Sequence, residues 1–233
     1  MKTFSGKSFL CFAMATMIAL SVWAAPAKSI VAMLSPEGVM RVEFDGEEFG
    51  QMVPGVFEDG WTMSQLEAGQ TDKPAADGVR RGTVTAQSGG EVTTELRIAP
   101  VKDGQKFSYK LTPKEKMKLN SLFVRLNVAA DSLAGGSYVA DGEDAKFPKD
   151  LDQVSLKEGD MKSLKITDPK GNVLQFDFPA ATPLVVQDDR KWSERFVIHI
   201  GPRMSDAEDW PAGKSVTIEF TLTSPKGISA KDE

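Results

Sequence analysis

The chain contains one histidine, His199, and this side chain is the one best suited to proton transfer near neutral pH. In residues 195–200 apolar residues alternate with Arg195 and His199, so these two side chains face away from the inferred core. The same alternation in residues 216–222 places Glu219 on the side opposite the core. If the two strands pair, His199 and Glu219 come within reach of each other and form the acid–base pair of an enzyme. The alternative is a structural or surface role for His199, as on most solvated sheet faces.

A glycan-cleaving enzyme would draw on a wider set of outward-facing polar side chains. These supply guanidinium, amide and carboxylate groups for binding the hydroxyl groups of a sugar. The set comprises Arg125, Asn127, Gln175, Asp177, Arg195, His199 and Glu219. The sequence contains no Gly-x-Ser-x-Gly, phosphate-loop, dinucleotide or His-Glu-x-x-His motif, so none of those reaction classes is predicted.

The densest polar cluster is residues 187–192, Gln-Asp-Asp-Arg-Lys-Trp, between two predicted strands. Loops on a rigid scaffold carry most binding groups, so this segment is a candidate ligand site. The indole of Trp192 would stack on a sugar ring, while Asp188, Asp189 and Arg190 would bind its hydroxyl groups. The alternative is a tight turn whose aspartates accept hydrogen bonds from backbone N–H groups, with Trp192 packed on the core.

Two further tryptophans stand beside carboxylates in predicted loops. Trp61 follows Glu58 and Asp59, and Trp210 follows Asp209. These surroundings suit sugar binding, so both tryptophans join the candidate ligand-binding residues. The alternative for each is a ring that fills the core.

The sequence predicts no cofactor and no histidine or thiolate metal site, because one His and one Cys cannot supply the ligands. Calcium is a weaker candidate. Residues 141–144, Asp-Gly-Glu-Asp, offer oxygen ligands but lack the spacing of a calcium-binding loop. A solvated acidic turn is the alternative.

The N-terminal residues 1–27 have the pattern of a cleaved secretory signal. Lys2 and Lys7 precede an apolar run at residues 9–23, and small residues then offer a cut before Lys28. The alternative is a membrane anchor, but a spanning helix needs about 20 apolar residues, more than the run at residues 9–23 provides. No other apolar run in the chain approaches that length. We therefore expect a secreted or periplasmic protein with no membrane span after cleavage. Cys11 would leave with the signal, so no thiol would remain.

The charge balance argues against nucleic-acid binding. The full chain has 28 basic and 33 acidic residues, a net charge of −5. Losing Lys2 and Lys7 with the signal leaves 28 − 2 = 26 basic residues against 33 acidic ones, a net charge of −7. An acidic protein is repelled by phosphate backbones.

The remaining residues show period-two alternation of apolar side chains, which is typical of half-buried strands. Turn signals such as Asp-Gly and Gly-Gly separate the strands. We expect an all-β fold, a two-sheet antiparallel β-sandwich of supersandwich or jelly-roll type with about eleven to thirteen strands. The domain should span residues 28–223 and end in a flexible tail, 224–233; two smaller sandwiches are the alternative. The clearest runs are 107–111, 122–128, 174–178, 196–200 and 216–222.

The C-terminal half also carries a resemblance. Its predicted strands and loops follow one another in a characteristic order, which includes one Asp-Arg-x-Trp loop. The segments are 122–128, 134–136, 140–142, 147–148, 174–176, 187–192, 196–200, 212–214 and 218–222. It resembles β-sandwich domains of the galactose-mutarotase-like supersandwich type, which are attached to secreted bacterial glycoside hydrolases. The match covers roughly the last 110 residues. It implies a sandwich and a polysaccharide context, but carries over no catalytic residues.

Three functions remain open at this stage. The first is a secreted, non-catalytic module that binds carbohydrate or assists glycan degradation. The second is a polysaccharide lyase or glycoside hydrolase that acts on a polar sheet face. The third is an envelope-associated module that binds a protein partner through a sheet edge or flat face.

Overall fold

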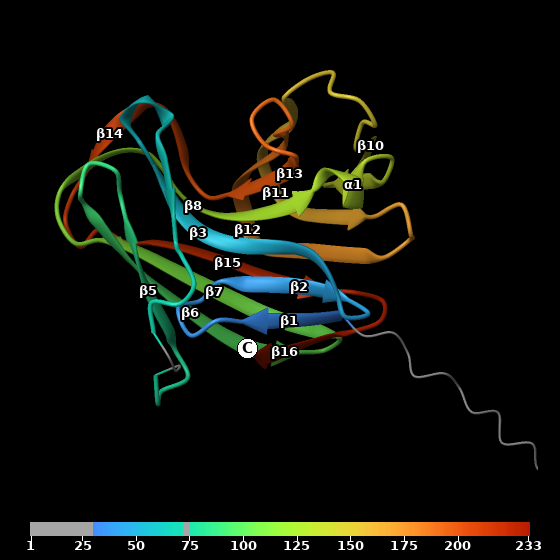
Figure 1. The fold of residues 1–233 in the computed structure, drawn as a ribbon, viewed down its shortest axis with the longest axis horizontal. Helices are drawn as coiled ribbons and strands as arrows, with labels where there is room; N and C mark the ends of the chain where they lie inside the picture. Colours follow the sequence, from blue (N-terminus) through green and yellow to red (C-terminus); the bar gives the residue numbers. More distant parts are fainter. Residues whose placement is uncertain (1–29, 72–74) are drawn as a thin grey trace, which may run out of the picture.

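The computed structural model describes residues 30–71 and 75–233, and nearly all of its regular structure is β-strand (Figure 1). Strands follow one another with few helical residues between them, so the expected all-β class is confirmed. The elements are β1 (Ile30–Leu34), β2 (Met40–Phe44), β3 (Glu47–Glu58), the 3-10 turn η1 (Asp59–Trp61), β4 (Met63–Gln65), β5 (Arg80–Thr85), β6 (Glu91–Val101), β7 (Gly104–Pro113), β8 (Met117–Ala129), α1 (Ala130–Leu133), β9 (Ser137–Ala140), β10 (Glu143–Lys146), β11 (Ser155–Thr167), β12 (Val173–Asp188), β13 (Arg195–Ile200), β14 (Arg203–Trp210), β15 (Val216–Thr223) and β16 (Ile228–Asp232).

The strands form one curled, continuously hydrogen-bonded sheet of 16 strands. The sequence predicts two separate sheets with about eleven to thirteen strands in total. Its main path runs β16-β1-β2-β3-β8-β13-β12-β15-β7-β6-β5, and the other strands pair beside it. The physical reason is the length of β12. Its first half pairs with β15 through residues 175–177, and its second half pairs with β13 through residues 184–188. One strand thus belongs to both layers, which alternation in the sequence does not reveal.

The apolar alternation predicts the core correctly. The inward positions of the five clearest runs contribute to one hydrophobic cluster, which joins β7 and β15 to β3, β8 and β13. Phe107 of β7 and Phe220 of β15 stack with ring centroids 5.4 Å apart. Figure 1 shows β1, β2 and β3 lying across β7 and β15, so the curled sheet encloses its core between two layers.

The expected flexible tail is wrong. Residues 228–232 form β16, which pairs in parallel with β1, so the first and last described strands lie side by side. Ile228 is buried, and Asp232 forms an ion pair with Arg80 of β5. This ion pair connects the two ends of the curled sheet. The sequence did not reveal this strand, because the segment is short and charged and has only one buried apolar residue, Ile228.

The predicted signal segment, residues 1–27 with Cys11, lies outside the described residues. Among the residues that are described, no helix has the length and apolar character needed to cross a membrane.

Candidate functional site

One layer of the sheet has a second, partly polar face that points away from the core. We call this the outer face: the side of β3, β8, β13 and the second half of β12 opposite the main core. Phe123, Val185 and Val197 are buried there, yet they are not part of the main core cluster. The other side chains of the outer face used below are Gln51, Phe57, Arg125, Asn127, Gln187, Asp189, Arg195 and His199.

The predicted pairing of His199 with Glu219 is wrong. The strand of His199, β13, lies between β8 and β12, whereas the strand of Glu219, β15, lies between β12 and β7. His199 stands opposite Arg125 on one side and Val185 on the other. The carboxylate of Glu219 instead forms an ion pair with Lys106, at 3.3 Å. Alternation indicates which face a side chain occupies but not which strand is its neighbour.

His199 is enclosed by aromatic rings. Its imidazole lies 5.5 Å from the ring of Phe57 and 5.3 Å from that of Phe123, measured between centroids, and the residue is 6% exposed. No hydrogen-bond partner for its Nδ1 atom occurs among the described residues. Burial lowers the pKa of His199 to about 3, with help from the positive charges of Arg125 and Arg203. The imidazole is therefore neutral at physiological pH.

A buried arginine lies at the centre of the outer face. Arg125 donates a hydrogen bond from Nε to the Oδ1 atom of Asn127, and its Nη2 lies 3.5 Å from Oδ2 of Asp189. A third contact is made with the sulfur of Met63. Burial lowers the pKa of Arg125, Asp189 opposes that effect, and Arg195 adds to it. An arginine nonetheless keeps its charge in proteins, so the outer face contains a fixed cation.

The carboxylate of Asp189 connects this arginine to the turn between β12 and β13. It accepts hydrogen bonds from Gln187 Nε2 at 2.7 Å and from Ser193 Oγ at 2.8 Å. Its backbone N–H donates to the carbonyl of Arg195 at 3.0 Å. Asp189 thus belongs to the outer face, which the sequence did not indicate, and it also shapes the turn, as in the tight-turn alternative.

Asp188 and Arg190 act as a structural clamp. Arg190 donates from Nε and Nη2 to the two carboxylate oxygens of Asp188, at 2.8 Å and 2.6 Å. Its remaining donors reach the backbone carbonyls of Pro148 and Lys149, and its guanidinium lies 4.9 Å from the ring centre of Phe196. The side chain of Asp188 is fully buried. Both side chains are committed to protein contacts, which matches the tight-turn alternative.

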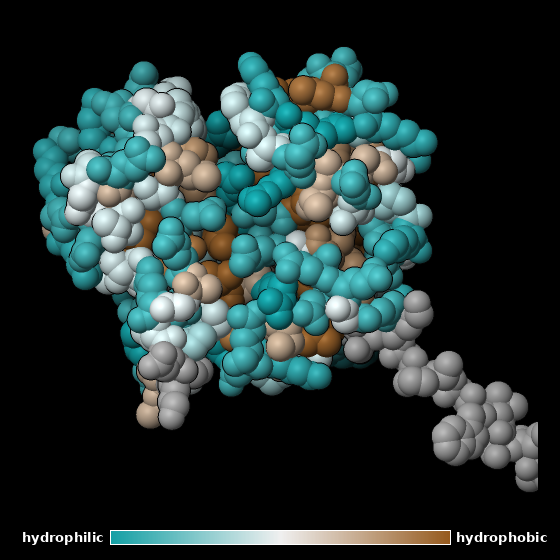
Figure 2. Space-filling model, in the orientation of Figure 1, coloured by the Kyte–Doolittle hydropathy of each residue, from teal (hydrophilic) through white to brown (hydrophobic). Residues whose placement is uncertain are grey.

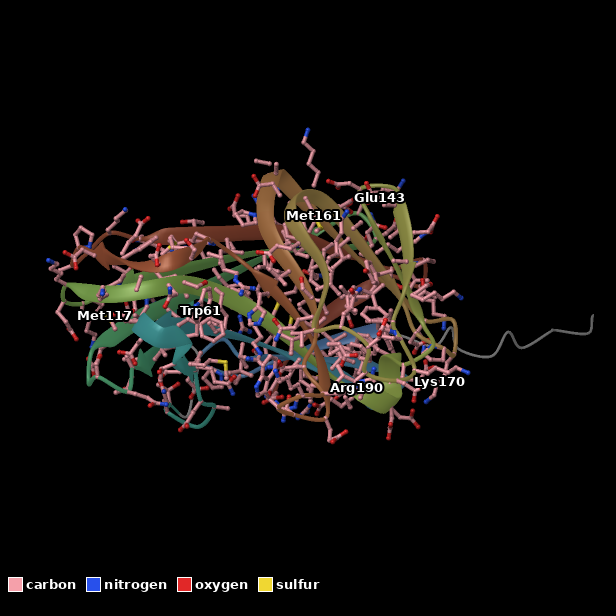
Figure 3. All side chains as sticks on the ribbon, turned by 90° about the horizontal axis from the view of Figure 1, so that it is seen from above. Trp61, Met117, Glu143, Met161, Lys170 and Arg190 are labelled. Carbon is pink, nitrogen blue, oxygen red and sulfur yellow. The ribbon has the colours of Figure 1, made fainter. Side chains whose placement is uncertain are left out.

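The three candidate tryptophans differ in exposure. Trp210 is buried in the core cluster with Lys214 over its ring, which matches the alternative of a ring that fills the core. Trp192 is 63% exposed, and Trp61 is 37% exposed. Figure 3 shows Trp61 near Met117 and well separated from Arg190, which stands two residues before Trp192 in the chain.

Trp61 has an unusual backbone. Its φ angle is +63°, a left-handed value that a bulky residue rarely adopts. Its ring lies 5.5 Å from that of Phe57, and the guanidinium of Arg203 stands 4.7 Å above it. Trp61 is thus the exposed tip of an aromatic cluster formed with Phe57, Phe123 and His199.

Two small hollows flank the outer face. One, of about 230 Å³, is lined by Gln51, Asn127 and Arg195. The other, of about 220 Å³, is lined by Val185 and Arg203 among others. Figure 2 shows hydrophilic side chains covering most of the side on which β1 to β3 lie in front, with hydrophobic side chains visible between them.

Other predicted residues lie elsewhere. Gln175 donates to Asp177 at 2.8 Å, on the half of β12 that pairs with β15, so this pair is not part of the outer face. The calcium candidate Asp141 accepts hydrogen bonds from the backbone N–H groups of Lys162 and Ser163, at 2.9 Å and 2.8 Å. Among the described residues no group of three or more His, Cys, Asp or Glu side chains could hold a metal ion. The calcium prediction stays untested.

Sequence reasoning missed Phe57 and Arg203. Phe123 was visible as an outward position in the alternation of residues 121–128, and its aromatic character was the available signal. Nothing in the sequence links Arg203 to Trp61, because they are 142 positions apart and the contact arises only from the pairing of β14 with β8.

No protein-family model matches the chain, and no curated protein is similar to it at a significant level. Among solved structures it is similar to the Slr1438 protein from Synechocystis sp. PCC 6803, with a TM-score of 0.40 and 10% sequence identity. That alignment covers 83% of this chain and 90% of the other. A similarity this weak carries no argument about function.

Proposed function

We propose that the protein is a secreted, non-catalytic module that binds carbohydrate in support of glycan degradation, and that it does so on the outer face beside Trp61. The observation that carries the proposal is the exposed Trp61 ring, held in a strained backbone and supported by Phe57 and Arg203. In this proposal the curled sheet acts as a sandwich whose two layers are joined through β12.

Strain at Trp61 supports a binding role. A left-handed backbone at a non-glycine residue costs about 1–3 kcal/mol and persists where the surroundings enforce it, often at ligand sites. Here the strain keeps a large aromatic ring 37% exposed next to a polar face. A sugar presents C–H groups to such a ring and hydroxyl groups to the polar side chains around it.

The polar groups of the outer face, which lie toward the end opposite Trp61, suit recognition of hydroxyl groups on further sugar units of the same chain. Gln51 and Gln187 are half-buried amides on the outer face, and Gln187 is oriented by the hydrogen bond that it donates to Asp189. Asn127 and Asp189 are buried and held by Arg125. Groups that are already oriented lose little conformational entropy when a ligand binds.

The surroundings of His199 favour binding over catalysis. The imidazole is neutral and enclosed by rings, and Glu219 is on a strand that does not neighbour it. A glycosidase needs two carboxyl groups at a set separation. The proposed acid–base pair therefore does not form, and glycan cleavage becomes an outcome of the experiment below.

The test is a thermal-shift and calorimetric screen of the purified protein against neutral and acidic polysaccharides, with each mixture sampled for new reducing or unsaturated ends. We expect a rise in Tm with at least one polysaccharide and no new ends, because a ligand that binds only the folded state stabilises it. New ends would make the protein an enzyme. No shift with any polysaccharide would contradict the proposal and favour a protein partner.

The matched variants are Trp61→Ala and Trp192→Ala, which each remove one exposed indole. We expect Trp61→Ala to weaken binding about tenfold, the loss of about 1.4 kcal/mol that one stacking contact supplies. Trp192→Ala should change the affinity less than about twofold. The reverse order would place the site at the turn of residues 189–194.

A further inference from the structure

Three arginine side chains gather on or beside the outer face. Arg125 is buried at its centre, whereas Arg195 and Arg203 are exposed. Arg195 lies at the Asn127 end of the face, and Arg203 lies at the Trp61 end. Their positive charges act on the same region of the face. The charge of Arg195 lowers the pKa of Arg125, and the charges of Arg125 and Arg203 lower the pKa of His199.

The exposed pair also differs from every other arginine. The chain has eight arginines, all within the described residues. Six of them, Arg41, Arg80, Arg81, Arg97, Arg125 and Arg190, lie within 4.0 Å of a carboxylate. In residues 30–71 and 75–233, Arg195 and Arg203 are the two with no such ion pair. The protein has a net charge of −5, and the two guanidinium groups without an ion pair in the described residues lie at the two ends of the outer face.

Carboxylates do stand near each arginine. Glu48 and Glu194 line the same hollow as Arg195, and Glu158 and Asp160 line the same hollow as Arg203. None of these is within ion-pair distance of the arginine that shares its hollow. Their negative charges repel an anionic ligand, so its anionic groups must contact the guanidinium groups directly in order to bind.

The spacing of the arginines sets the size of the ligand. Arg195 and His199 are four residues apart on β13, which corresponds to roughly 13 Å along a strand. Arg203 lies beyond the His199 end, next to Trp61. A monosaccharide cannot reach from one arginine to the other, whereas a chain of several sugar units can.

We propose that the outer face binds an acidic polysaccharide, with anionic groups on separate sugar units engaging Arg195 and Arg203 and one sugar ring stacked at Trp61. This inference rests on the proposed function and specifies its ligand class. A guanidinium binds a carboxylate or a sulfate through two parallel hydrogen bonds, so both anionic groups fit.

The experiment measures affinity by calorimetry for three probes: polygalacturonate, which carries carboxylates; a sulfated galactan; and neutral xylan. The variants are Arg195→Gln/Arg203→Gln, Arg195→Lys/Arg203→Lys and, as a control, Arg97→Gln. Arg97 is an exposed arginine of β6 with only a long ion pair, at 3.9 Å. Unfolding is recorded for every variant, so that a folding defect is recognised.

We expect one of the two acidic probes to bind at least tenfold more tightly than xylan, with an affinity that falls as salt is raised. The affinity of the double glutamine variant for that probe should be about tenfold weaker than that of the wild type, and the double lysine variant should lose less affinity. The affinity of Arg97→Gln should stay within about twofold of the wild type. The carboxylate and sulfate probes show which anionic group is preferred.

The outcomes separate the inference from the proposed function. Binding of xylan as tight as that of the acidic probes would overturn the inference and leave the proposed function standing. A double glutamine variant that binds like Arg97→Gln would also overturn it. Absence of binding to all three probes, and to the wider polysaccharide panel, would overturn both.

Discussion

His199 and Arg125 stand directly opposite each other on the neighbouring strands β13 and β8, and both point to the outer face. Among the described residues the Nδ1 atom of His199 has no hydrogen-bond partner, whereas the guanidinium of Arg125 is held by Asn127 and Asp189. Burial lowers the pKa of His199, and the positive charges of Arg125 and Arg203 lower it further, so the imidazole stays neutral.

The folded protein should lose stability through His199 as the pH falls. The folded-state pKa is about 3, below the ordinary value of 6.5, so only the unfolded state takes up this proton between those values. Above pH 6.5 this proton uptake has no effect on the free energy of unfolding. Between pH 6.5 and about pH 3 it lowers the free energy of unfolding by up to about 1.4 kcal/mol for each pH unit. Urea unfolding of the wild type and of His199→Phe at a series of pH values checks this. The stability of the variant relative to the wild type should rise as the pH drops. Plots of unfolding free energy against pH that run parallel for the two proteins would contradict the prediction.

Arg190→Ala should be strongly destabilising. It leaves the fully buried carboxylate of Asp188 without its partner, which typically costs about 3–5 kcal/mol. The matched control is Arg81→Ala, which breaks an exposed pair with Asp77 and should cost less than about 1 kcal/mol. Denaturant unfolding of both variants measures the difference. Equal losses would show that Asp188 is not a buried charge.

Removal of residues 228–233 should lower Tm by several degrees, because it takes away the pairing of β16 with β1 and the Arg80–Asp232 ion pair. Lys231→Ala is the control, since this side chain is exposed. A truncated protein with unchanged Tm would mean that the segment is a flexible tail after all.

Gly55→Ala should disturb the aromatic cluster of the outer face. A Cβ atom at this position would lie 2.6 Å from the carbonyl oxygen of Ser64 and 2.7 Å from the ring of Phe123. Overpacking of this kind costs about 1–3 kcal/mol. We also expect weaker glycan binding at a temperature where the variant is fully folded, because Phe123 and Phe57 support Trp61. Unfolding curves and calorimetry test the two effects separately.

Part of the site was visible in the sequence. Alternation correctly assigned Arg125, Asn127 and His199 to a face away from the core. The dense polar cluster of residues 187–192 indicated Asp189 as a ligand-binding residue, with a turn residue as the alternative. Alternation failed for Glu219 because a period of two reports the side of a sheet and contains no information on strand order. The burial of Trp210 was not predictable either, because carboxylates beside an indole in the sequence do not decide whether the ring turns inward.

The sequence alone determined the all-β class and the members of the core, because side-chain alternation in a strand is a local property that each segment carries by itself. Only the tertiary structure decided that β12 joins the two layers, that β16 closes the edge beside β1, and that Arg203 stacks on Trp61. Each of these contacts joins residues far apart in the chain. Such contacts depend on which strands become neighbours, and that is settled by the packing of the whole sheet around one core.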